Sequence, residues 1–246
     1  YINYNGLLKS FFSYNFIGED MKKLFLMIFI FFILTLNANA ISANSVTVMD
    51  SDTKRILYSH NGDEKRLIAS ITKIMTSLVA IKNSNINDIV EINESVLKSY
   101  GSGIYVEVGE QISLEDLLYG LMLRSGNDAA IAIADYVSGS MEKFNELMNE
   151  MATSIGMKST TFINSSGLEN DKGIGKISTS NDMALLMSEA IKNKIFQKIV
   201  RTKKHTVKTN YKTYIWHNKN KLLSNYKYCT GGKTGFTEKA RRTLVT

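Results

Sequence analysis

Runs of strand-forming residues lie at both ends of the stretch 46–246 and enclose a long helical middle, and this order restricts the fold most. Strand-type runs occupy 46–49 and 55–58, and the turn-forming residues between them predict a hairpin. Further strand-type runs occupy 207–216 and 243–246. Because strands come first and last, the sequence predicts an α+β fold whose antiparallel sheet is built from both chain ends.

The helical middle has apolar residues at the spacing of amphipathic helices. Ser70 is predicted to be the N-cap of the first helix, and Ser113, followed three residues later by Asp116, predicts a capping box for the second. Gly156 is predicted to end the fourth helix. The predicted helices span 71–81, 117–123, 128–137, 141–155 and 179–192.

Residues 21–40 carry the parts of a secretory signal peptide. Two lysines follow Met21, an uninterrupted apolar run covers 24–34, and an Ala-Asn-Ala end closes at Ala40. The apolar run is shorter than the roughly 20 residues that a membrane-spanning helix needs. We therefore predict cleavage after Ala40 and export to the cell envelope, with a cut at Ala43 or an uncleaved N-terminal anchor as the alternatives.

The rest of the chain divides into an upstream segment and one domain. Residues 1–20 fit no targeting pattern and are predicted to be translated upstream sequence that the natural product lacks. Residues 41–246 are predicted to form one exported domain, and a composition of 44% hydrophobic and 22% charged residues excludes a disordered chain. With Cys229 as the only cysteine, an intrachain disulfide and a cysteine-rich zinc site are both excluded.

Basic residues are concentrated near the C-terminus. The formal net charge is +7, and residues 191–246 contain 15 Lys and Arg against one acid, Glu238. Such a stretch is typical of a solvated face, and in an exported protein it can also contact anionic wall polymers or lipid head groups. Because the predicted destination is the cell envelope, we expect no nucleic-acid partner.

Ser70 and Lys73 are the first candidate site residues. Residues three apart lie on one face of a helix, so Lys73 should lie one turn behind Ser70. A serine becomes an effective nucleophile when a base removes its proton, and lysine can be that base when burial or another positive charge destabilises its ammonium. Backbone N–H groups at the helix N-terminus suit a developing oxyanion. Taken alone, the pair also fits an N-cap serine and a surface lysine.

Two further segments carry polar groups suited to binding and proton transfer. Ser125 and Asn127 follow an apolar predicted helix, where a hydroxyl can relay a proton and an amide can hold a substrate amide. Lys233 and Thr234 suit a substrate carboxylate, and Gly235 leaves room for a substrate along a strand edge. Taken alone, these segments also fit ordinary turns.

Together and in this order, the three segments resemble the motif set of the serine-acylating penicillin-recognising enzymes. Within them the chain is most similar to the low-molecular-mass D-alanyl-D-alanine carboxypeptidases. The resemblance runs from about Val46 to the last residue and is strongest over 69–76, 116–130 and 232–237. It implies a DD-peptidase/β-lactamase-like fold, in which helices flank the sheet and form a helical subdomain.

The resemblance also implies a reaction that uses no metal or organic cofactor. Ser70 would attack the carbonyl of the penultimate D-Ala of a peptidoglycan stem peptide, with Lys73 as general base. Ser125 would help to pass the proton to the leaving D-alanine, and water would hydrolyse the acyl-enzyme. β-Lactam antibiotics, the second implied partner, would acylate the same serine.

The remaining site residues would bind the substrate. The resemblance implies that Asn127 orients the substrate amide and that Lys233 and Thr234 bind the terminal carboxylate. Gly235 would lie along the bound substrate. The backbone N–H groups of Ser70 and Phe236 would form the oxyanion hole.

The chain departs from the family pattern at several positions, and three of these bear on the backbone or the site. Arg124 stands directly before Ser125, where the family commonly has a proline that presets φ. Lys54 and Arg241 stand where the resemblance predicts glycine, and a side chain at positive φ costs on the order of 1 kcal/mol. Family members also continue past Thr246 with further strands, a helix and often a membrane anchor. We therefore expect a C-terminally truncated domain, whose association with a membrane surface would need the missing region.

Two other functions remain open. A penicillin-recognising envelope protein that has lost turnover would keep the fold and bind without catalysis. A class A-like β-lactamase would need a deacylating glutamate in a Glu-x-x-x-Asn setting, whereas Glu146 and Asn149 have the wrong spacing and lie in a predicted helix.

Overall fold

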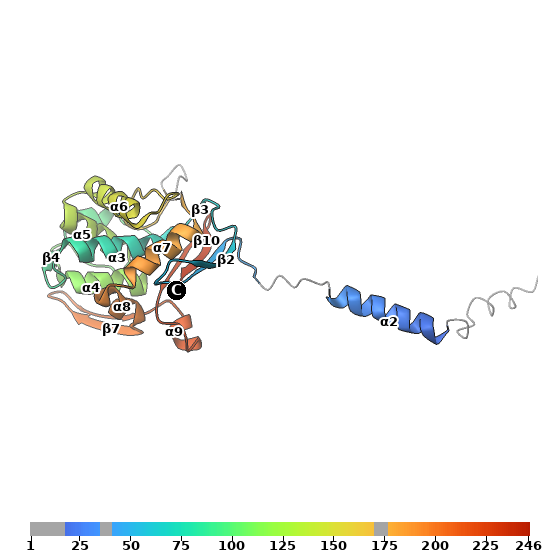
Figure 1. Cartoon of the computed structure of the whole chain (residues 1–246). Coiled ribbons are helices and arrows are strands. Elements are labelled where there is room, and N and C mark those ends of the chain that lie inside the picture. Colours follow the sequence, from blue (N-terminus) through green and yellow to red (C-terminus); the bar gives the residue numbers. More distant parts are fainter. Residues whose placement is uncertain (1–17, 35–40, 170–176) are drawn as a thin grey trace, which may run out of the picture. The chain divides into compact units, whose positions relative to one another are not determined.

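The computed structural model describes residues 18–34, 41–169 and 177–246. The chain divides into two units, Tyr1–Ala43 and Asn44–Thr246 (Figure 1). In the first unit, α2 (Glu19–Leu34) covers the predicted apolar run, and no helix in the described ranges is long and apolar enough to span a bilayer. The predicted cleavage site at Ala40 and most of the predicted upstream segment lie outside the described residues.

The second unit alternates short strands with helices. The α-helices are α3 (Lys73–Asn83), α4 (Leu114–Tyr119), α5 (Asn127–Ser138), α6 (Met141–Ile155), α7 (Ser180–Ala190), α8 (Lys194–Arg201) and α9 (Leu222–Asn225). Two 3₁₀ turns, η1 (Ala69–Thr72) and η2 (Glu94–Lys98), and one π turn, η3 (Gly120–Arg124), complete the helical elements. The strands are β1 (Val46–Met49), β2 (Ile56–His60), β3 (Arg66–Leu67), β4 (Ile89–Glu91), β5 (Gln111–Ser113), β6 (Ile177–Ser178), β7 (Lys204–Lys208), β8 (Thr213–His217), β9 (Lys233–Thr237) and β10 (Arg241–Val245).

All five predicted helices are present, with corrections at their ends. Ser113 is confirmed as the N-cap of α4, because its hydroxyl accepts a hydrogen bond from the Asp116 backbone N–H; the Asp116 carboxylate accepts from the Ser113 hydroxyl and not from its backbone N–H, so the capping box is incomplete. Gly156 ends α6 with φ of 92°, as predicted. The prediction of Ser70 as an N-cap is wrong: α3 is preceded by η1, whose N-cap is Ile68, and the Ser70 hydroxyl accepts from the Lys73 side chain instead.

The predicted β1–β2 hairpin is confirmed, whereas the predicted strand 207–216 is two strands. The Thr209 backbone N–H donates to the Lys212 carbonyl, which closes a turn between β7 and β8. The alternating pattern of the sequence continues through this turn, so periodicity alone does not reveal it. In the resulting hairpin, His205 and Trp216 are paired and face inward.

The α+β fold is confirmed, but the strands form five separate two-stranded antiparallel ladders in the described residues. The β1–β2 and β9–β10 hairpins, from opposite ends of the unit, both contact α7. The predicted sheet from both chain ends is therefore present as two hairpins against one helix. Within the described residues, no ladder joins one hairpin to the other.

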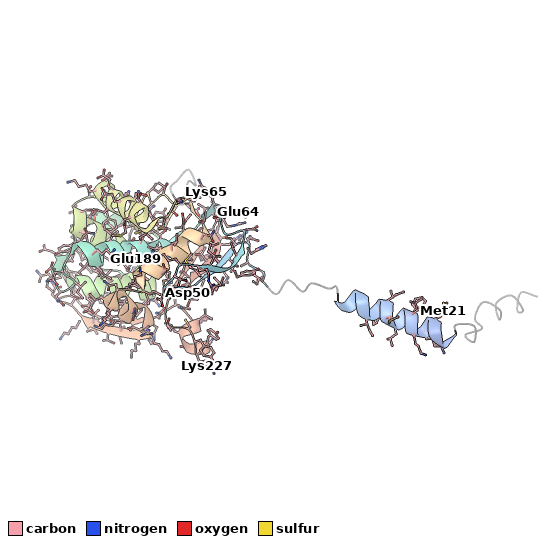
Figure 2. The ribbon with its side chains drawn as sticks, in the orientation of Figure 1. Met21, Asp50, Glu64, Lys65, Glu189 and Lys227 are labelled. Atoms are coloured by element: carbon pink, nitrogen blue, oxygen red, sulfur yellow. The ribbon has the colours of Figure 1, made fainter. Side chains whose placement is uncertain are left out.

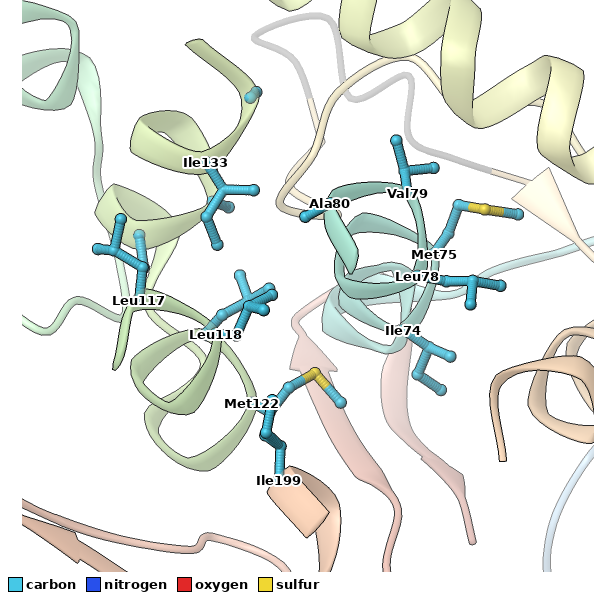
Figure 3. Close-up of a cluster of buried hydrophobic side chains, with 14 of the residues drawn as sticks. Ile74, Met75, Leu78, Val79, Ala80, Leu117, Leu118, Met122, Ile133 and Ile199 are labelled. Carbon is cyan, nitrogen blue, oxygen red and sulfur yellow. The ribbon is translucent and has the colours of Figure 1, made fainter. Parts of the chain in front are cut away.

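The core surrounds α3, which is the central helix of the second unit (Figure 3). Residues 74–80 of α3 are almost fully buried, and α5, α6, α7, η3 and α8 pack around α3. Leu118, Met122 and Ile133 lie on the facing helices. Burial of one such side chain contributes about 1.5–3 kcal/mol. This packing fixes the N-terminal end of α3, where Lys73 lies.

Lys54 and Arg241 both adopt the left-handed backbone conformation, with φ of 60° and 61°. Asp50, labelled in Figure 2, begins the β1–β2 turn. Its carboxylate accepts hydrogen bonds from the Thr53 backbone N–H and hydroxyl, which lower the pKa of Asp50. Lys54 then donates its N–H to the Asp50 carbonyl. The expectation that these two positions suit glycine is therefore supported by their φ values.

We expect Arg241→Gly and Lys54→Gly each to raise the free energy of unfolding by about 0.5–1 kcal/mol, because glycine relieves the positive-φ strain. The loss of the Arg241 ion pair with Glu238 should matter little, since both side chains are more than three-quarters exposed. Urea unfolding measures the change. The control is Lys239→Gly in the same β9–β10 turn, which should lower stability; an equal fall in Arg241→Gly would contradict the prediction.

Candidate active site

Ser70 and Lys73 meet at the start of α3. Lys73 is fully buried, and its Nζ donates to Ser70 Oγ at 3.1 Å. Two more hydrogen bonds hold the same ammonium, to Asn127 Oδ1 at 2.7 Å and to the Ser166 carbonyl at 2.6 Å. Lys73 is therefore held by three segments of the chain, and its amine lies within proton-transfer distance of the Ser70 hydroxyl.

The second predicted segment begins where the π turn η3 ends. Ser125 has φ of 66°, a left-handed conformation that is costly for a residue with a side chain and typical of functional sites. The Asp128 carboxylate stabilises the start of α5 by accepting hydrogen bonds from the backbone N–H groups of Ile104, Tyr105 and Ala129. This network fixes the loop that presents the Ser125 hydroxyl.

Asn127 joins three parts of the site. Its side-chain oxygen accepts from Lys73, and its side-chain nitrogen donates to the Tyr100 carbonyl at 2.6 Å. Its backbone N–H donates to the Ser102 carbonyl at 2.7 Å. Gly101 has φ of 81°, and a Cβ there would come within 3.2 Å of the Asn127 amide nitrogen. The chain at 100–102 therefore approaches Asn127 closely.

Lys233 and Ser125 form a second amine–hydroxyl pair. Lys233 is almost fully buried, and its Nζ donates to Ser125 Oγ at 3.0 Å and to the Thr234 carbonyl at 2.6 Å. Burial, reinforced by the positive charge of Lys219, lowers the pKa of Lys233 to about 7.

Gly235 allows β9 to lie directly against η1. A Cβ at Gly235 would overlap the Thr243 hydroxyl and come within 3.0 Å of the Ser70 backbone nitrogen. The structure thus gives Gly235 a packing role, and the prediction that it leaves room for a substrate remains a prediction. Phe236 follows on the same strand and is 54% exposed.

The segment 164–167 contributes to the site although the motifs do not include it. The Asn164 side-chain oxygen accepts from the backbone N–H of Gly167 at 2.9 Å, and the Ser166 carbonyl accepts from Lys73. Gly167 has φ of 88°, and a Cβ there would overlap the Ala69 carbonyl next to Ser70. The Asn-Ser-Ser-Gly sequence is typical of a turn. It does not indicate that this turn supplies the Ser166 carbonyl to the site.

The three predicted segments converge in the fold. One hydrogen-bonded group contains Ser70, Lys73 and Asn127. A second contains Lys233 and Ser125, which is two residues before Asn127 in the chain. Thr234 and Phe236 lie on β9, whose Gly235 abuts Ser70. In the ranges that the structure describes, no cluster of three His, Cys, Asp or Glu side chains is arranged to hold a metal. The arrangement suits nucleophilic attack by a serine with an amine as its base.

Glu146 and Asn149 lie in α6, and Asn149 is engaged outside the site. Its side-chain nitrogen donates to the Phe162 carbonyl and its side-chain oxygen accepts from the Phe162 N–H. Asn149 is therefore held against Phe162, and the predicted placement of both residues in a helix is confirmed.

Comparisons with known proteins agree with this geometry. The sequence profile of the D-alanyl-D-alanine carboxypeptidase family matches residues 34–246. D-alanyl-D-alanine carboxypeptidase DacF of Bacillus subtilis is 34% identical over 82% of this chain and 53% of its own length. DacC of Escherichia coli is 36% identical over 86% of this chain and 54% of its own length. The chain thus spans about half the length of these two relatives.

Solved structures show the same fold. A D-alanyl-D-alanine carboxypeptidase from Mycobacterium tuberculosis superposes with a TM-score of 0.78 at 29% identity, over 82% of this chain and 76% of that one. A variant of a Streptomyces DD-transpeptidase gives a TM-score of 0.77 at 35% identity, over 82% of this chain and 84% of that one.

Proposed function

The chain belongs to the D-alanyl-D-alanine carboxypeptidase family, and we propose that it removes the terminal D-alanine from peptidoglycan stem peptides through an acyl-enzyme. The observation that carries the proposal is the buried Lys73 amine, 3.1 Å from the Ser70 hydroxyl, beside the second amine–hydroxyl pair of Lys233 and Ser125. Its site of action would be the cell envelope, which the predicted export of the chain would allow.

In the acylation step, Ser70 Oγ attacks the carbonyl carbon of the penultimate D-Ala and Lys73, in its neutral form, takes the hydroxyl proton. The backbone N–H groups of Ser70 and Phe236 stabilise the oxyanion. The close approach of β9 to the Ser70 nitrogen supports this assignment, because it brings both segments to one side of the serine.

Collapse of the tetrahedral intermediate breaks the peptide bond and leaves the acyl group on Ser70. Ser125 helps to pass the proton that Lys73 took from Ser70 to the leaving nitrogen, so that Lys73 returns to its neutral form, and the hydrogen bond of Ser125 with Lys233 supports that role. Asn127, held between Lys73 and the Tyr100 carbonyl, orients the substrate amide. Water then hydrolyses the ester and frees the shortened stem peptide.

The D-alanine that leaves carries a carboxylate, which Lys233 and Thr234 bind at the end of the site. Gly235 lies beside them on β9. A penicillin carries a carboxylate in the corresponding position, so it enters the same site and acylates Ser70.

The proposal is tested with residues 41–246 in two separate samples, one given a labelled penicillin and one given a peptide that ends in D-Ala-D-Ala. We expect a lasting label on Ser70 in the first sample and release of D-alanine in the second. Rapid loss of the label with hydrolysis of penicillin would instead indicate a β-lactamase. A folded protein that takes no label and releases no D-alanine would indicate an envelope protein without turnover, and either result would overturn the proposal.

A further inference from the structure

Glu169 lies where three segments of the candidate site meet. Its backbone carbonyl accepts a hydrogen bond from the Tyr100 hydroxyl at 2.8 Å, and its side-chain Oε1 accepts from the Thr237 hydroxyl at 2.7 Å. Tyr100 belongs to the chain that approaches Asn127, and Thr237 is the last residue of β9. Glu169 itself comes two residues after the turn 164–167. The residue therefore joins three segments, each of which also contacts the site.

The Glu169 carboxylate is held in place by Thr237. The Thr237 hydroxyl accepts from the Ala240 backbone N–H at 3.0 Å, so its own proton is directed to Glu169 Oε1. The Glu169 side chain is partly buried, and its carboxylate can accept more hydrogen bonds than this one. A carboxylate that is already fixed loses less side-chain entropy when a ligand binds than a mobile surface carboxylate does.

The face of β9 that carries Thr237 is the face that meets the site. Side chains alternate along a strand, so Lys233, Gly235 and Thr237 share one face. On that face the Lys233 amine lies within the site, and Gly235 abuts the Ser70 backbone nitrogen. Thr237 and the carboxylate of Glu169 therefore lie on the site face of β9, at the end of the strand away from Lys233.

The order of residues along β9 distinguishes the two ends of a bound substrate. In the proposed function, Lys233 and Thr234 bind the carboxylate of the leaving D-alanine. Because Ser70 lies next to the middle of β9, the acyl part of the peptide extends toward the opposite end of the strand. Thr237 is three residues beyond Thr234, which corresponds to about 10 Å along a strand. The carboxylate held by Thr237 is therefore on the acyl side of the nucleophile.

Tyr100 gives the same direction independently. Its backbone carbonyl accepts from the Asn127 side chain at 2.6 Å, and its hydroxyl donates to the Glu169 carbonyl. Asn127 is the residue proposed to orient the substrate amide, so one tyrosine spans the distance from that amide to Glu169. A substrate held by Asn127 would therefore present the residue before its D-Ala-D-Ala end to Glu169.

We propose that Glu169, held by Thr237, is a subsite for a side-chain ammonium on the residue that precedes the D-Ala-D-Ala end of the substrate. A hydrogen bond between an ammonium and a carboxylate is stronger than one between neutral groups, so the subsite selects stem peptides with a basic residue there. This inference rests on the proposed function, because the direction of the substrate along β9 follows from it. Glu169 is then a specificity-determining residue outside the three motif segments.

The test compares two N-acetylated peptides that end in Lys-D-Ala-D-Ala, one with a free lysine side chain and one with an acetylated lysine side chain. The wild type should prefer the free ammonium about fivefold in kcat/KM. Glu169→Gln keeps an acceptor oxygen for Thr237 but removes the charge, so it should bring the ratio of the two peptides close to unity. Glu169→Lys should invert the preference, which a merely structural role of Glu169 would not produce.

Glu238→Gln is the matched control. Glu238 directly follows Thr237, but its side chain is 85% exposed and pairs with Arg241 at 3.7 Å. The substitution therefore removes the same charge from the same end of β9, and it should leave the peptide ratio within about twofold of the wild-type ratio. Equal loss of preference in Glu169→Gln and Glu238→Gln would indicate a general effect of charge and would overturn the subsite.

A wild type that turns over both peptides equally, or a folded Glu169→Gln variant that keeps the wild-type ratio, would also overturn the inference. Failure of the proposed function looks different, because the wild type would then take no penicillin label and release D-alanine from neither peptide. In that case the inference is tested by calorimetry on the Ser70→Ala protein. Tighter binding of the free-lysine peptide, lost on adding Glu169→Gln, would support the subsite, and equal or absent binding of both peptides would refute it.

Discussion

The Lys73→Ala variant is expected to lose acylation by penicillin by roughly a thousandfold or more, because Ser70 then has no base within reach. In the wild type the Lys73 amine lies 3.1 Å from the Ser70 hydroxyl. Among the described residues, the other buried amine, Lys233, donates to Ser125 instead. The second-order rate constant of labelling by penicillin measures the loss.

Loss of folding must be separated from loss of the base. Lys73 is fully buried and holds Asn127 and the Ser166 carbonyl, so truncation also leaves a cavity and two polar groups without this donor. Lys73→Met keeps most of the volume and removes only the amine, and it should fail to label while retaining a cooperative unfolding transition. Lys82→Ala, at the exposed end of α3, is the control for the helix. Labelling of the methionine variant at the wild-type rate would refute the assigned base.

The Gly167→Ala variant is expected to lose more than about 4 kcal/mol of folding stability and all labelling by penicillin. A Cβ at this position would overlap the Ala69 carbonyl, and the φ of 88° is itself unfavourable for alanine. The overlap involves backbone on both sides, so it cannot be relieved by rotation of a side chain. Urea unfolding and the labelling assay measure the two effects.

Gly139→Ala is the matched control for Gly167→Ala. Gly139 has a similar φ of 77°, but a Cβ there meets no atom within 4 Å. Its substitution should therefore cost only about 1 kcal/mol and leave labelling unchanged. Equal effects of the two substitutions would show that φ alone, and not contact with the nucleophile turn, makes Gly167 necessary.

The sequence predicts the α+β class and the helices well, because capping and amphipathic spacing are local. Ser113 at the start of α4 and Gly156 at the end of α6 act through their immediate neighbours, and both predictions are confirmed. The sequence does not reveal the β7–β8 turn, because its residues continue the alternating pattern of the strands. It does not reveal the division of the sheet into two hairpins either, because strand pairing depends on contacts between distant segments.

For the site, the sequence indicates the side chains but not the backbone groups around them. Ser70, Ser125 and Lys233 are identified by residue type and spacing, and the structure brings their segments together. The group of Ser166 that accepts a hydrogen bond from Lys73 is the backbone carbonyl, which every residue has. No residue type in the sequence therefore indicates this contact. Arg124 stands beside Ser125 in the sequence itself, whereas the approach of Lys219 to this turn, through its backbone hydrogen bond to the Leu123 carbonyl, required knowledge of which loops meet.

The contact of Gly235 with the Ser70 backbone also determines when during folding the site can form. The two residues are separated by most of the second unit, so their contact closes a long loop, which is entropically costly and slow. The surroundings of Ser70 are thus completed only when the C-terminal hairpin docks. Under the proposed function, reactivity of Ser70 toward penicillin is therefore expected only after this hairpin has docked.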